Sequence, residues 1–208
     1  MNQNHLEMEV KFYLNDLAAF EQRLRSIGAS LVQPRTFETN LRFDTPDLSL
    51  TKAHRVLRLR HDQTNYLTYK GPAQPGKAVT IRQEIEIEVN DFETTKALLE
   101  ALGYQESVRY EKWRTKYRLE NMGIDLDEMP YGNFVEIEGD DAARIERMAL
   151  SLALAWSLHL NESYMMLFER VKQNKALKVH NLVFNDFKNI KIRSEDLGVK
   201  PADIVTYL

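Results

Sequence analysis

Charged and apolar residues alternate in several short segments of the chain, and acids and bases are sorted into different segments. Glu7, Glu9 and Lys11 alternate with apolar residues in the first segment. Because side chains of an extended strand point alternately to its two faces, these three charges would share one face. Acidic pairs of the same spacing occur at Glu84/Glu86, Asp125/Asp127 and Glu136/Glu138, and basic pairs at Arg58/Arg60 and Lys112/Arg114.

A solvated face of an antiparallel sheet explains such alternation for any single strand. The sorting of acids and bases into separate strands favours a binding site instead. If helices cover the apolar faces and the sheet closes into a barrel, the charged faces line its interior. Unpaired charge there costs several kcal/mol per ion, so the interior requires a charged ligand. Arginine and lysine bind phosphate oxygens and carboxylates bind hard divalent cations, which indicates a metal-bound polyphosphate.

The charged segments are predicted to be strands of one large, mostly antiparallel sheet. They lie at residues 6–14, 40–45, 55–61, 65–71, 79–89, 110–119, 123–128 and 133–139, and turn-forming sequences separate them.

Two predicted helices follow strands with the same order of cap, apolar stripe and glycine stop. Asn15 or Asp16 caps the first helix, which ends at Gly28. Asn90-Asp91 and Gly103 take the same places in the second, an offset of 75 residues in both cases (91 minus 16 and 103 minus 28). This correspondence indicates an internal duplication. Further helices are predicted at residues 140–161 and 163–173, followed by a tail of mixed character.

Composition sets limits on the class of protein. A chain of 208 residues is long enough for one good-sized core, so a single domain with appendages is expected. The net charge of −3 gives no general affinity for nucleic acid or an anionic membrane. The absence of cysteine excludes disulfides and thiolate metal sites, and together with an N-terminus unlike a secretory signal it predicts a cytoplasmic location.

The segment Glu7-Met8-Glu9-Val10-Lys11 resembles the N-terminal Glu-x-Glu-x-Lys signature of the CYTH superfamily, the triphosphate tunnel metalloenzymes. Further matches are FDTPDLSL, LRLR, LTYKGP, KWRTKY and DLDEMPYGNFVEIEG, in family order, so that the resemblance covers residues 5–168. It implies an α+β fold: an antiparallel eight-stranded barrel, the triphosphate tunnel, with peripheral helices. We expect the tunnel domain at residues 1–170 and a helical or irregular extension at 171–208 packed on it.

The resemblance also implies roles for residues. It assigns Mg²⁺ or Mn²⁺ to Glu7, Glu9, Asp127, Glu136 and Glu138, and the phosphates to Lys11, Arg58, Arg60, Lys70, Lys112 and Arg114. Lys11, Lys70 and Glu136 are expected to act in catalysis, whereas the roles of Glu84 and Glu86 are left open. One ion would hold the triphosphate while a second ion or a carboxylate activates water for in-line attack.

The implied function is metal-dependent hydrolysis of a small triphosphate: inorganic triphosphate, thiamine triphosphate or a nucleoside triphosphate. The alternative is a class IV adenylyl cyclase, which converts ATP to cyclic AMP and pyrophosphate in the same kind of tunnel. A noncatalytic sensor is a third interpretation, which the number of acidic residues disfavours. An RNA triphosphatase ranks low because no basic track is visible. The expected partner is thus a small-molecule triphosphate. Neither DNA nor a membrane is expected to bind, and the formation of a homodimer is left open.

Three details refine this picture. Arg42 stands where the thiamine triphosphatase branch has a tyrosine, so a tyrosine–lysine base is disfavoured and Arg42 becomes an additional phosphate ligand. Residues 71–78 match the start of a P-loop, but two prolines and an alanine in place of serine or threonine argue against one. Tyr164 is expected to lie in the apolar core.

Overall fold

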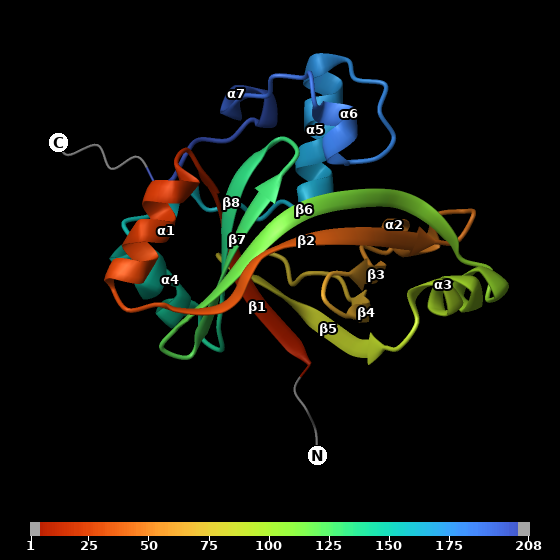
Figure 1. The fold of residues 1–208 in the computed structure, drawn as a ribbon, viewed down its shortest axis with the longest axis horizontal. Coiled ribbons are helices and arrows are strands. Elements are labelled where there is room, and N and C mark those ends of the chain that lie inside the picture. The colour runs from red at the N-terminus through yellow and green to blue at the C-terminus, as the bar shows by residue number, and fades with distance from the viewer. Residues whose placement is uncertain (1–4, 204–208) are drawn as a thin grey trace.

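Eight antiparallel strands close into a barrel in the computed structural model, which describes residues 5–203 (Figure 1). The strands are β1 Leu6–Leu14, β2 Ser30–Asp44, β3 Val56–His61, β4 Asn65–Lys70, β5 Thr80–Val89, β6 Gln105–Leu119, β7 Met122–Met129 and β8 Gly132–Glu138. Their order around the barrel is β1-β5-β4-β3-β2-β6-β7-β8. The predicted α+β class with an eight-stranded antiparallel barrel is confirmed.

Strand β2 is longer than predicted, because the sequence pattern indicated only its last third. Its first part contains Pro34, which cannot donate to a sheet, and the register with β6 shifts on both sides of this residue. Such bulges bend and twist a strand and break the simple alternation of side chains. The 15-residue strands β2 and β6 pair over most of their length and form the long wall of the barrel.

Helices α1 (Leu17–Ser26) and α3 (Phe92–Ala101) begin and end as predicted. The side chains of Asp16 and Asp91 each accept a hydrogen bond from the amide three residues further on. Gly28 and Gly103 follow with φ angles of 88° and 90°, a region that glycine adopts without strain. Both halves of the barrel therefore contain a strand followed by a helix with the same kind of cap and glycine stop, and the internal duplication stays a prediction.

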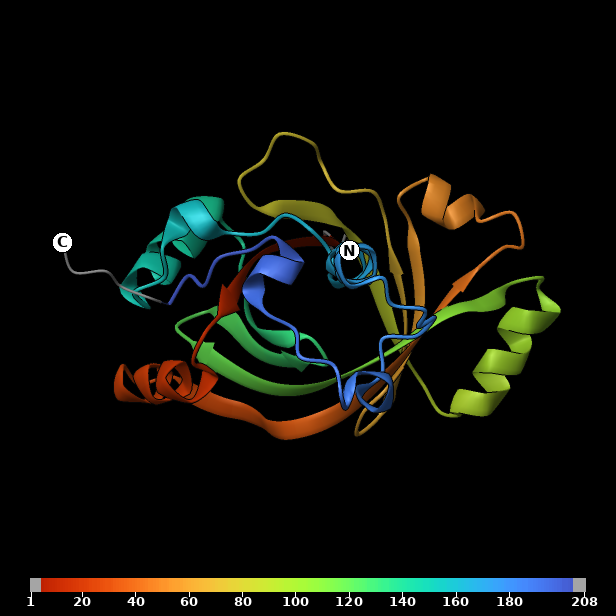
Figure 2. The same cartoon turned by 90° about the horizontal axis from the view of Figure 1, so that it is seen from above.

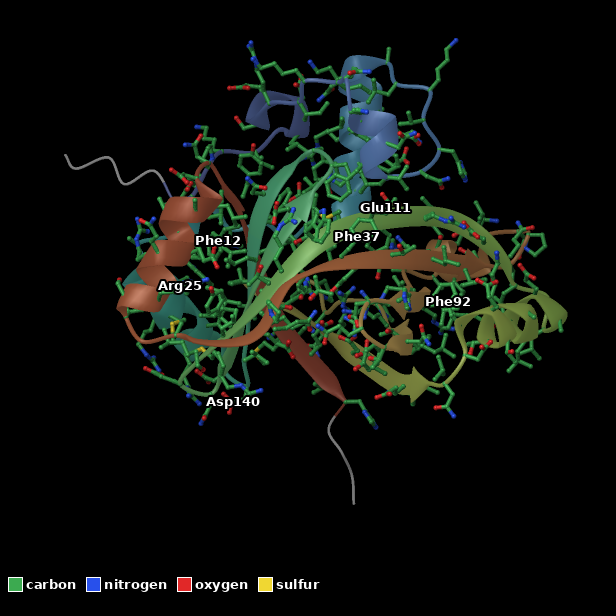
Figure 3. All side chains as sticks on the ribbon, in the orientation of Figure 1. Phe12, Arg25, Phe37, Phe92, Glu111 and Asp140 are labelled. Carbon is green, nitrogen blue, oxygen red and sulfur yellow. The ribbon has the colours of Figure 1, made fainter. Side chains whose placement is uncertain are left out.

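Apolar strand residues point outward and pack against the helices. Phe12 of β1, labelled in Figure 3, is fully buried in a core with Phe20 of α1 and Ile145 of α4 (Ala142–Ser151). A smaller core joins Leu59 of β3 to Leu99 of α3. Because helices take the outer face of the sheet, the inner face is left to the charged residues.

The helix predicted at residues 140–161 is interrupted. Helix α4 ends at Ser151, Ala153 has a φ of 55°, and a short 3₁₀ helix follows at Trp156–Leu158. Leu152 and Leu154 are both buried. In a continuous helix they would lie about 200° apart around the axis, so only one could face the barrel. Among the described residues, no helix has the length and apolar character required to cross a membrane.

The C-terminal segment covers one end of the barrel. Figures 1 and 2 show α5 (Tyr164–Lys175) over this end, with α6 (Phe184–Phe187) and α7 (Ser194–Leu197) beside it. Phe168 and Val171 of α5 pack with Phe134 of β8 in a third core. The helix predicted at residues 163–173 is confirmed as α5. The predicted boundary between the tunnel domain (residues 1–170) and the C-terminal extension (171–208) falls inside this helix. A short helix α2 (Ser49–Lys52) follows β2.

Candidate functional site

The barrel brings the predicted site residues together on its inner face. Inward-facing charges come from every strand and form ion pairs across the lumen, which we call the tunnel. Its predicted members are Glu7, Glu9 and Lys11 on β1, Arg42 on β2, Arg58 and Arg60 on β3, Lys70 on β4, Lys112 and Arg114 on β6, Asp127 on β7, and Glu136 and Glu138 on β8.

One group of ion pairs centres on Arg114, whose side chain is 9% exposed. Its Nε donates to Asp127 Oδ1 at 2.6 Å, and its guanidinium also binds Glu136. Lys112 Nζ lies 3.0 Å from Asp127, and Lys11 Nζ lies 2.8 Å from Glu136. Burial by itself would raise the pKa of Glu136, but Lys11 and Arg114 lower it well below its ordinary value.

A second group centres on Glu7 of β1. Lys70 Nζ lies 2.7 Å from Glu7 and 2.9 Å from Glu84, and Arg82 Nε lies 2.9 Å from Glu7. Burial and a hydrogen bond with Glu7 raise the pKa of Glu84 to about 7. Burial acts in the same direction on Glu7, but Lys70 and Arg82 lower its pKa. Lys70 contacts both carboxyl groups, and the proton on Glu84, which is lost as the pH rises through about 7, is shared with Glu7.

The acidic strand β5, whose role the sequence left open, neutralises the basic strand β3. Glu86 lies 3.4 Å from Arg58 and 3.2 Å from Arg60, and the Thr68 hydroxyl donates to it at 2.7 Å. Glu84 takes the corresponding place beside Lys70. These acids therefore hold the basic side chains of Arg58, Arg60 and Lys70 in place.

The carboxylates at the β1–β8 seam have the chemistry of a cation site. Burial, and then the neighbouring Glu7, Asp125 and Glu9, raise the pKa of Glu138 to about 7. Burial and Glu136 likewise raise the pKa of Glu9. Oxygen ligands that repel one another suit a hard divalent cation, so Mg²⁺ or Mn²⁺ fits this donor set. In this structure, no group of three or more acidic or histidine side chains from residues 5–203 is arranged so that it could hold a metal ion.

Asp127 lies among cations instead of beside these carboxylates. It is fully buried, and Lys112, Arg114 and the Tyr164 hydroxyl all bind its oxygens. The predicted metal ligand Asp127 is thus bound by two basic side chains and a tyrosine, and its assignment to the metal stays a prediction.

Two tunnel residues on β2 escaped the sequence analysis. Glu38 and Asn40 are fully buried, and none of their side-chain oxygen or nitrogen atoms has a hydrogen-bond partner among the described residues. Burial would raise the pKa of Glu38, but Lys112, 3.5 Å away, and Arg114 lower it to about 2. The alternation of Glu38, Asn40 and Arg42 was the available signal, and the bulged start of β2 obscured it.

Tyr164 packs against the apolar core beside Phe134, as expected, and its hydroxyl also contacts the tunnel residues. Its hydroxyl donates to Asp127 at 2.7 Å, and Lys11 Nζ lies 4.3 Å from the centre of its ring. The first residue of α5 therefore closes the tunnel with a polar contact. Helical spacing cannot reveal this placement, because it depends on how α5 sits over the barrel end.

Replacing Tyr164 by phenylalanine should lower the free energy of unfolding by about 1–2 kcal/mol, because Asp127 loses one donor and keeps its cations. Urea denaturation followed by circular dichroism measures the change. An unfolding curve identical to that of the wild type would contradict a contribution of this hydroxyl to stability.

Stability in the absence of divalent cations should fall as the pH rises from about 6 to about 8. The pKa of Glu84 is about 7 in the folded protein and 4.5 ordinarily, so the folded state binds more protons in this interval. The stabilisation is present at low pH and is lost as the pH rises through 7. The raised pKa of Glu138 acts in the same direction.

Urea denaturation at pH 6 and pH 8 measures this change in the free energy of unfolding. The change should be smaller for Glu84→Gln, and it should equal that of the wild type for Glu93→Gln on the exposed helix α3. Greater stability at the higher pH would contradict this.

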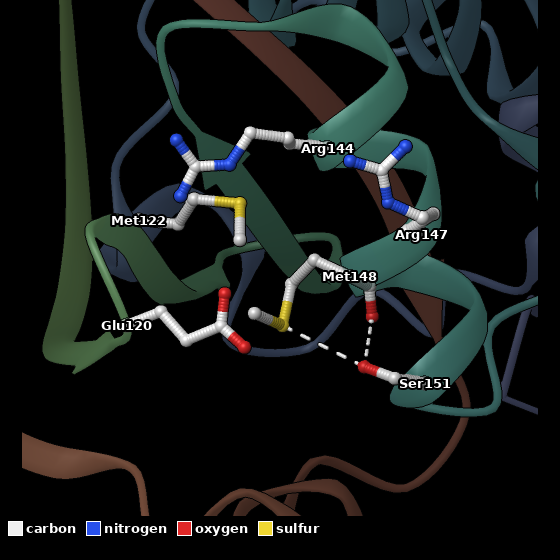
Figure 4. A pocket seen from close by; sticks show the side chains of 6 residues that line it. All are labelled: Glu120, Met122, Arg144, Arg147, Met148 and Ser151. Carbon is white, nitrogen blue, oxygen red and sulfur yellow. Dashed lines mark hydrogen bonds between the residues drawn. The ribbon is translucent and has the colours of Figure 1, made fainter.

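Apart from the tunnel, a cavity of about 260 Å³ is lined by residues of the β6–β7 turn and of α4 (Figure 4). Met122, Met148, Arg144 and Arg147 line it, and the Ser151 hydroxyl donates to the Met148 carbonyl at 2.8 Å. It contains none of the predicted site residues. The tunnel is therefore the candidate functional site.

Comparisons with known proteins agree with this geometry. A match to the CYTH domain family covers residues 5–155. The chain is 27% identical to Adenylate cyclase CyaB of Aeromonas hydrophila over 182 residues, 81% of this chain and 91% of that protein. A structure named as a putative adenylate cyclase from Vibrio parahaemolyticus has a TM-score of 0.71 at 22% identity, covering 80% of this chain and 99% of the other.

Another solved structure is that of HpAC1 from Hippeastrum, named a putative adenylyl cyclase with a dominant triphosphatase activity. Its TM-score is 0.63 at 18% identity, and the match covers 78% of this chain and 95% of that one. At these identities the two structures show a shared fold.

Proposed function

Because the chain belongs to the CYTH domain family, we propose that it is a divalent-metal-dependent hydrolase of small triphosphates. The observation that carries the proposal is the set of buried polar side-chain atoms in the tunnel that have no hydrogen-bond partner among residues 5–203. The Nε atoms of Arg58 and Arg60, both amide atoms of Asn40 and both oxygens of Glu38 belong to it, and Glu38 has only a longer ion pair with Lys112, at 3.5 Å. Buried donors without a hydrogen bond are costly, which argues for a ligand that accepts from Arg58, Arg60 and Asn40, as phosphate oxygens do.

The basic residues would bind the triphosphate. Lys11, Arg58, Arg60, Lys70, Lys112 and Arg114 all face the tunnel, and each is within 4 Å of a carboxylate. On binding, phosphate oxygens take the place of several of these carboxylates, whereas Asp127 stays bound to Lys112 and Arg114. Arg42 adds a cation that has no ion pair with any side chain of residues 5–203. Exchanging one set of anions for another avoids leaving buried cations unpaired.

The released carboxylates would hold the cation. Glu7, Glu9, Glu136 and Glu138 supply oxygen ligands for Mg²⁺ or Mn²⁺, which when bound neutralises phosphate charge and lowers the barrier to phosphoryl transfer. Asp127 stays with Lys112 and Arg114 and orients them toward the phosphates.

Three residues would act on the reacting groups. Lys11 of β1 and Lys70 of β4 stabilise the charge of the transferred phosphoryl group. Glu136 orients the attacking water and accepts its proton. Lys11 and Arg114 hold the pKa of Glu136 low. Once both turn to phosphate oxygens, the carboxylate becomes more basic.

A product analysis tests the proposal. Purified protein with Mg²⁺ or Mn²⁺ is offered tripolyphosphate, thiamine triphosphate and ATP, and products are resolved by anion-exchange chromatography. Release of orthophosphate is expected, with loss of activity in EDTA. The double variant Glu7→Gln/Glu9→Gln, prepared identically, excludes a contaminating phosphatase. Intact substrates under all conditions would overturn the proposal.

Adenylyl cyclase activity is the second candidate, and the similarity to Adenylate cyclase CyaB favours it. The same tunnel would hold ATP, but the ribose hydroxyl would attack the α-phosphate. Cyclic AMP and pyrophosphate in the product analysis would establish it in place of the hydrolase.

A further inference from the structure

The cavity of about 260 Å³ at the β6–β7 turn and α4 carries opposite charges on its two sides (Figure 4). We call it the α4 pocket, and its residues are Glu120, Met122, Arg144, Arg147, Met148 and Ser151. We propose that the α4 pocket binds a free α-amino acid with an apolar side chain. The pocket shares no residue with the tunnel, so this inference is independent of the proposed function.

Two arginines supply the positive side of the pocket. Arg144 and Arg147 are three residues apart in α4, so their side chains share one face of the helix. Arg144 lies 3.0 Å from Asp140, whose side chain is 76% exposed, and Arg147 forms no ion pair with any side chain of residues 5–203. Because an exposed ion pair is weak, a ligand carboxylate can replace Asp140. Guanidinium groups bind carboxylates through paired hydrogen bonds, so both arginines can bind the same ligand group.

Glu120 and Ser151 supply hydrogen-bond acceptors on the opposite side. Figure 4 shows both side chains below the methionines and the two guanidinium groups above them. The Ser151 hydroxyl donates to the Met148 carbonyl at 2.8 Å, so its lone pairs remain to accept a hydrogen bond. The Glu120 carboxylate forms no ion pair with any side chain in the described part of the chain. A ligand ammonium group would bind both oxygens.

The backbone of the turn gives an independent reason to assign Glu120 a role. Leu119 pairs with Met122, so Glu120 and Asn121 form a two-residue hairpin turn. Glu120 has a φ of 54°, the left-handed region, where glycine, asparagine and aspartate are preferred in such turns. The turn itself therefore does not account for a glutamate at this position. Residues held in this conformation concentrate at ligand-binding sites.

The floor between the two charged sides is apolar. Met122 and Met148 form it, and they are 2% and 5% exposed. Methionine side chains adapt to apolar groups of different shape. At about 260 Å³ the cavity is smaller than the roughly 300–1,000 Å³ of sites for drug-sized ligands, so it suits a ligand of amino-acid size.

Charge separates the candidate small ligands. Glu120 would repel a phosphate monoester, and Arg144 and Arg147 would repel an alkylamine. A simple carboxylate would leave Glu120 without a partner. A zwitterionic amino acid places its carboxylate at the arginines, its ammonium group at Glu120 and its side chain on the methionines.

A titration with L-leucine tests the inference. The full-length protein carries ¹³C-labelled methionine methyl groups, and NMR records their signals. The signals of Met122 and Met148 should shift and reach saturation, whereas that of Met166, 57% exposed on α5, should not move. Isocaproate and isoamylamine have the carbon chain of leucine without its ammonium group or its carboxylate. Each should bind about tenfold or more weakly than leucine, because one charged contact is lost.

Two variants assign the contacts to residues. Arg147→Gln should weaken leucine binding about tenfold. Glu120→Gln should weaken leucine binding to a similar extent but leave isocaproate binding unchanged. Arg55→Gln, a change at an exposed arginine outside the pocket, is the matched control and should bind leucine as the wild type does.

Three results would overturn the inference. They are the absence of a saturable shift at Met122 and Met148, equal affinities of the wild type for leucine and isocaproate, and wild-type leucine affinity in both pocket variants. Arg147 and Glu120 are exposed, and circular dichroism verifies that each variant is folded. If one variant fails to fold, the other decides together with the two leucine analogues.

Discussion

The variant Glu136→Gln should lower kcat/KM for the triphosphate substrate by about 10²–10³-fold, the largest effect expected from a single isosteric change in the tunnel. Glu136 contacts both Lys11 and Arg114, and it is proposed to hold the cation and to accept the proton from water. Glutamine keeps the shape of the side chain but removes the charge and the basic oxygen. Steady-state phosphate release over a range of substrate concentrations measures kcat and KM separately.

A titration with Mg²⁺ or Mn²⁺ distinguishes the two roles of Glu136. If its main role is to hold the cation, a high metal concentration should restore part of the activity of Glu136→Gln. If its main role is to accept the proton, kcat should remain low at saturating metal. Glu93→Gln on α3, far from the tunnel, carries the same change of charge and should behave as the wild type. A kcat/KM for Glu136→Gln within twofold of the wild type would contradict both roles.

The variant Arg114→Met should lower the free energy of unfolding by about 3–5 kcal/mol. Arg114 is the cation shared by Asp125, Asp127 and Glu136, and the Asp127 side chain has no exposed surface. Methionine of similar length fills the space but leaves Asp127 with Lys112, Glu136 with Lys11, and Asp125 with the neighbouring Lys116. Urea denaturation at neutral pH and low salt measures the loss.

A second substitution separates lost charge pairing from lost packing. Asp127→Asn in the Arg114→Met background should recover part of the stability, because the uncompensated charge is removed. Arg35→Met is the control, since Arg35 is half exposed in its ion pair with Glu128 and should contribute no more than about 1 kcal/mol. The prediction is wrong if Arg114→Met is no less stable than Arg35→Met.

Both predictions follow from the same feature of the tunnel. Its cations and carboxylates neutralise one another when no substrate is bound, which makes the charged interior compatible with folding. The same groups must be separable if phosphates and a metal ion are to replace their partners. Residues such as Arg114 are therefore expected to affect both stability and activity, so measurements of both are needed on each variant.

Much of the barrel was predictable from local sequence patterns. The alternation of Glu7, Glu9 and Lys11 with apolar residues identified β1 and its inner face, and the same reasoning identified β3, β5, β7 and β8. Aspartate caps and glycine stops bounded α1 and α3 to within a residue or two. These signals depend on neighbours in the chain, so a single sequence contains them.

Other elements were missed for physical reasons. The first part of β2 contains a proline and two register shifts, so its side chains do not alternate simply and Glu38 remained unnoticed. The helix after β8 stops early, because Leu152 and Leu154 must both be buried. Tyr164 packs against the core as its helical spacing indicated, but its contact with the tunnel residue Asp127 depends on where α5 is placed.

The sequence by itself determined that the chain has one charged and one apolar face on most strands, and which residues carry the charge. Only the tertiary structure decided which acid meets which base: Asp127 with Arg114 and Lys112, Glu84 with Lys70, and Glu86 with Arg58 and Arg60. The reason is that alternation along a strand is a local property, whereas barrel closure and register set distances between residues far apart in the chain.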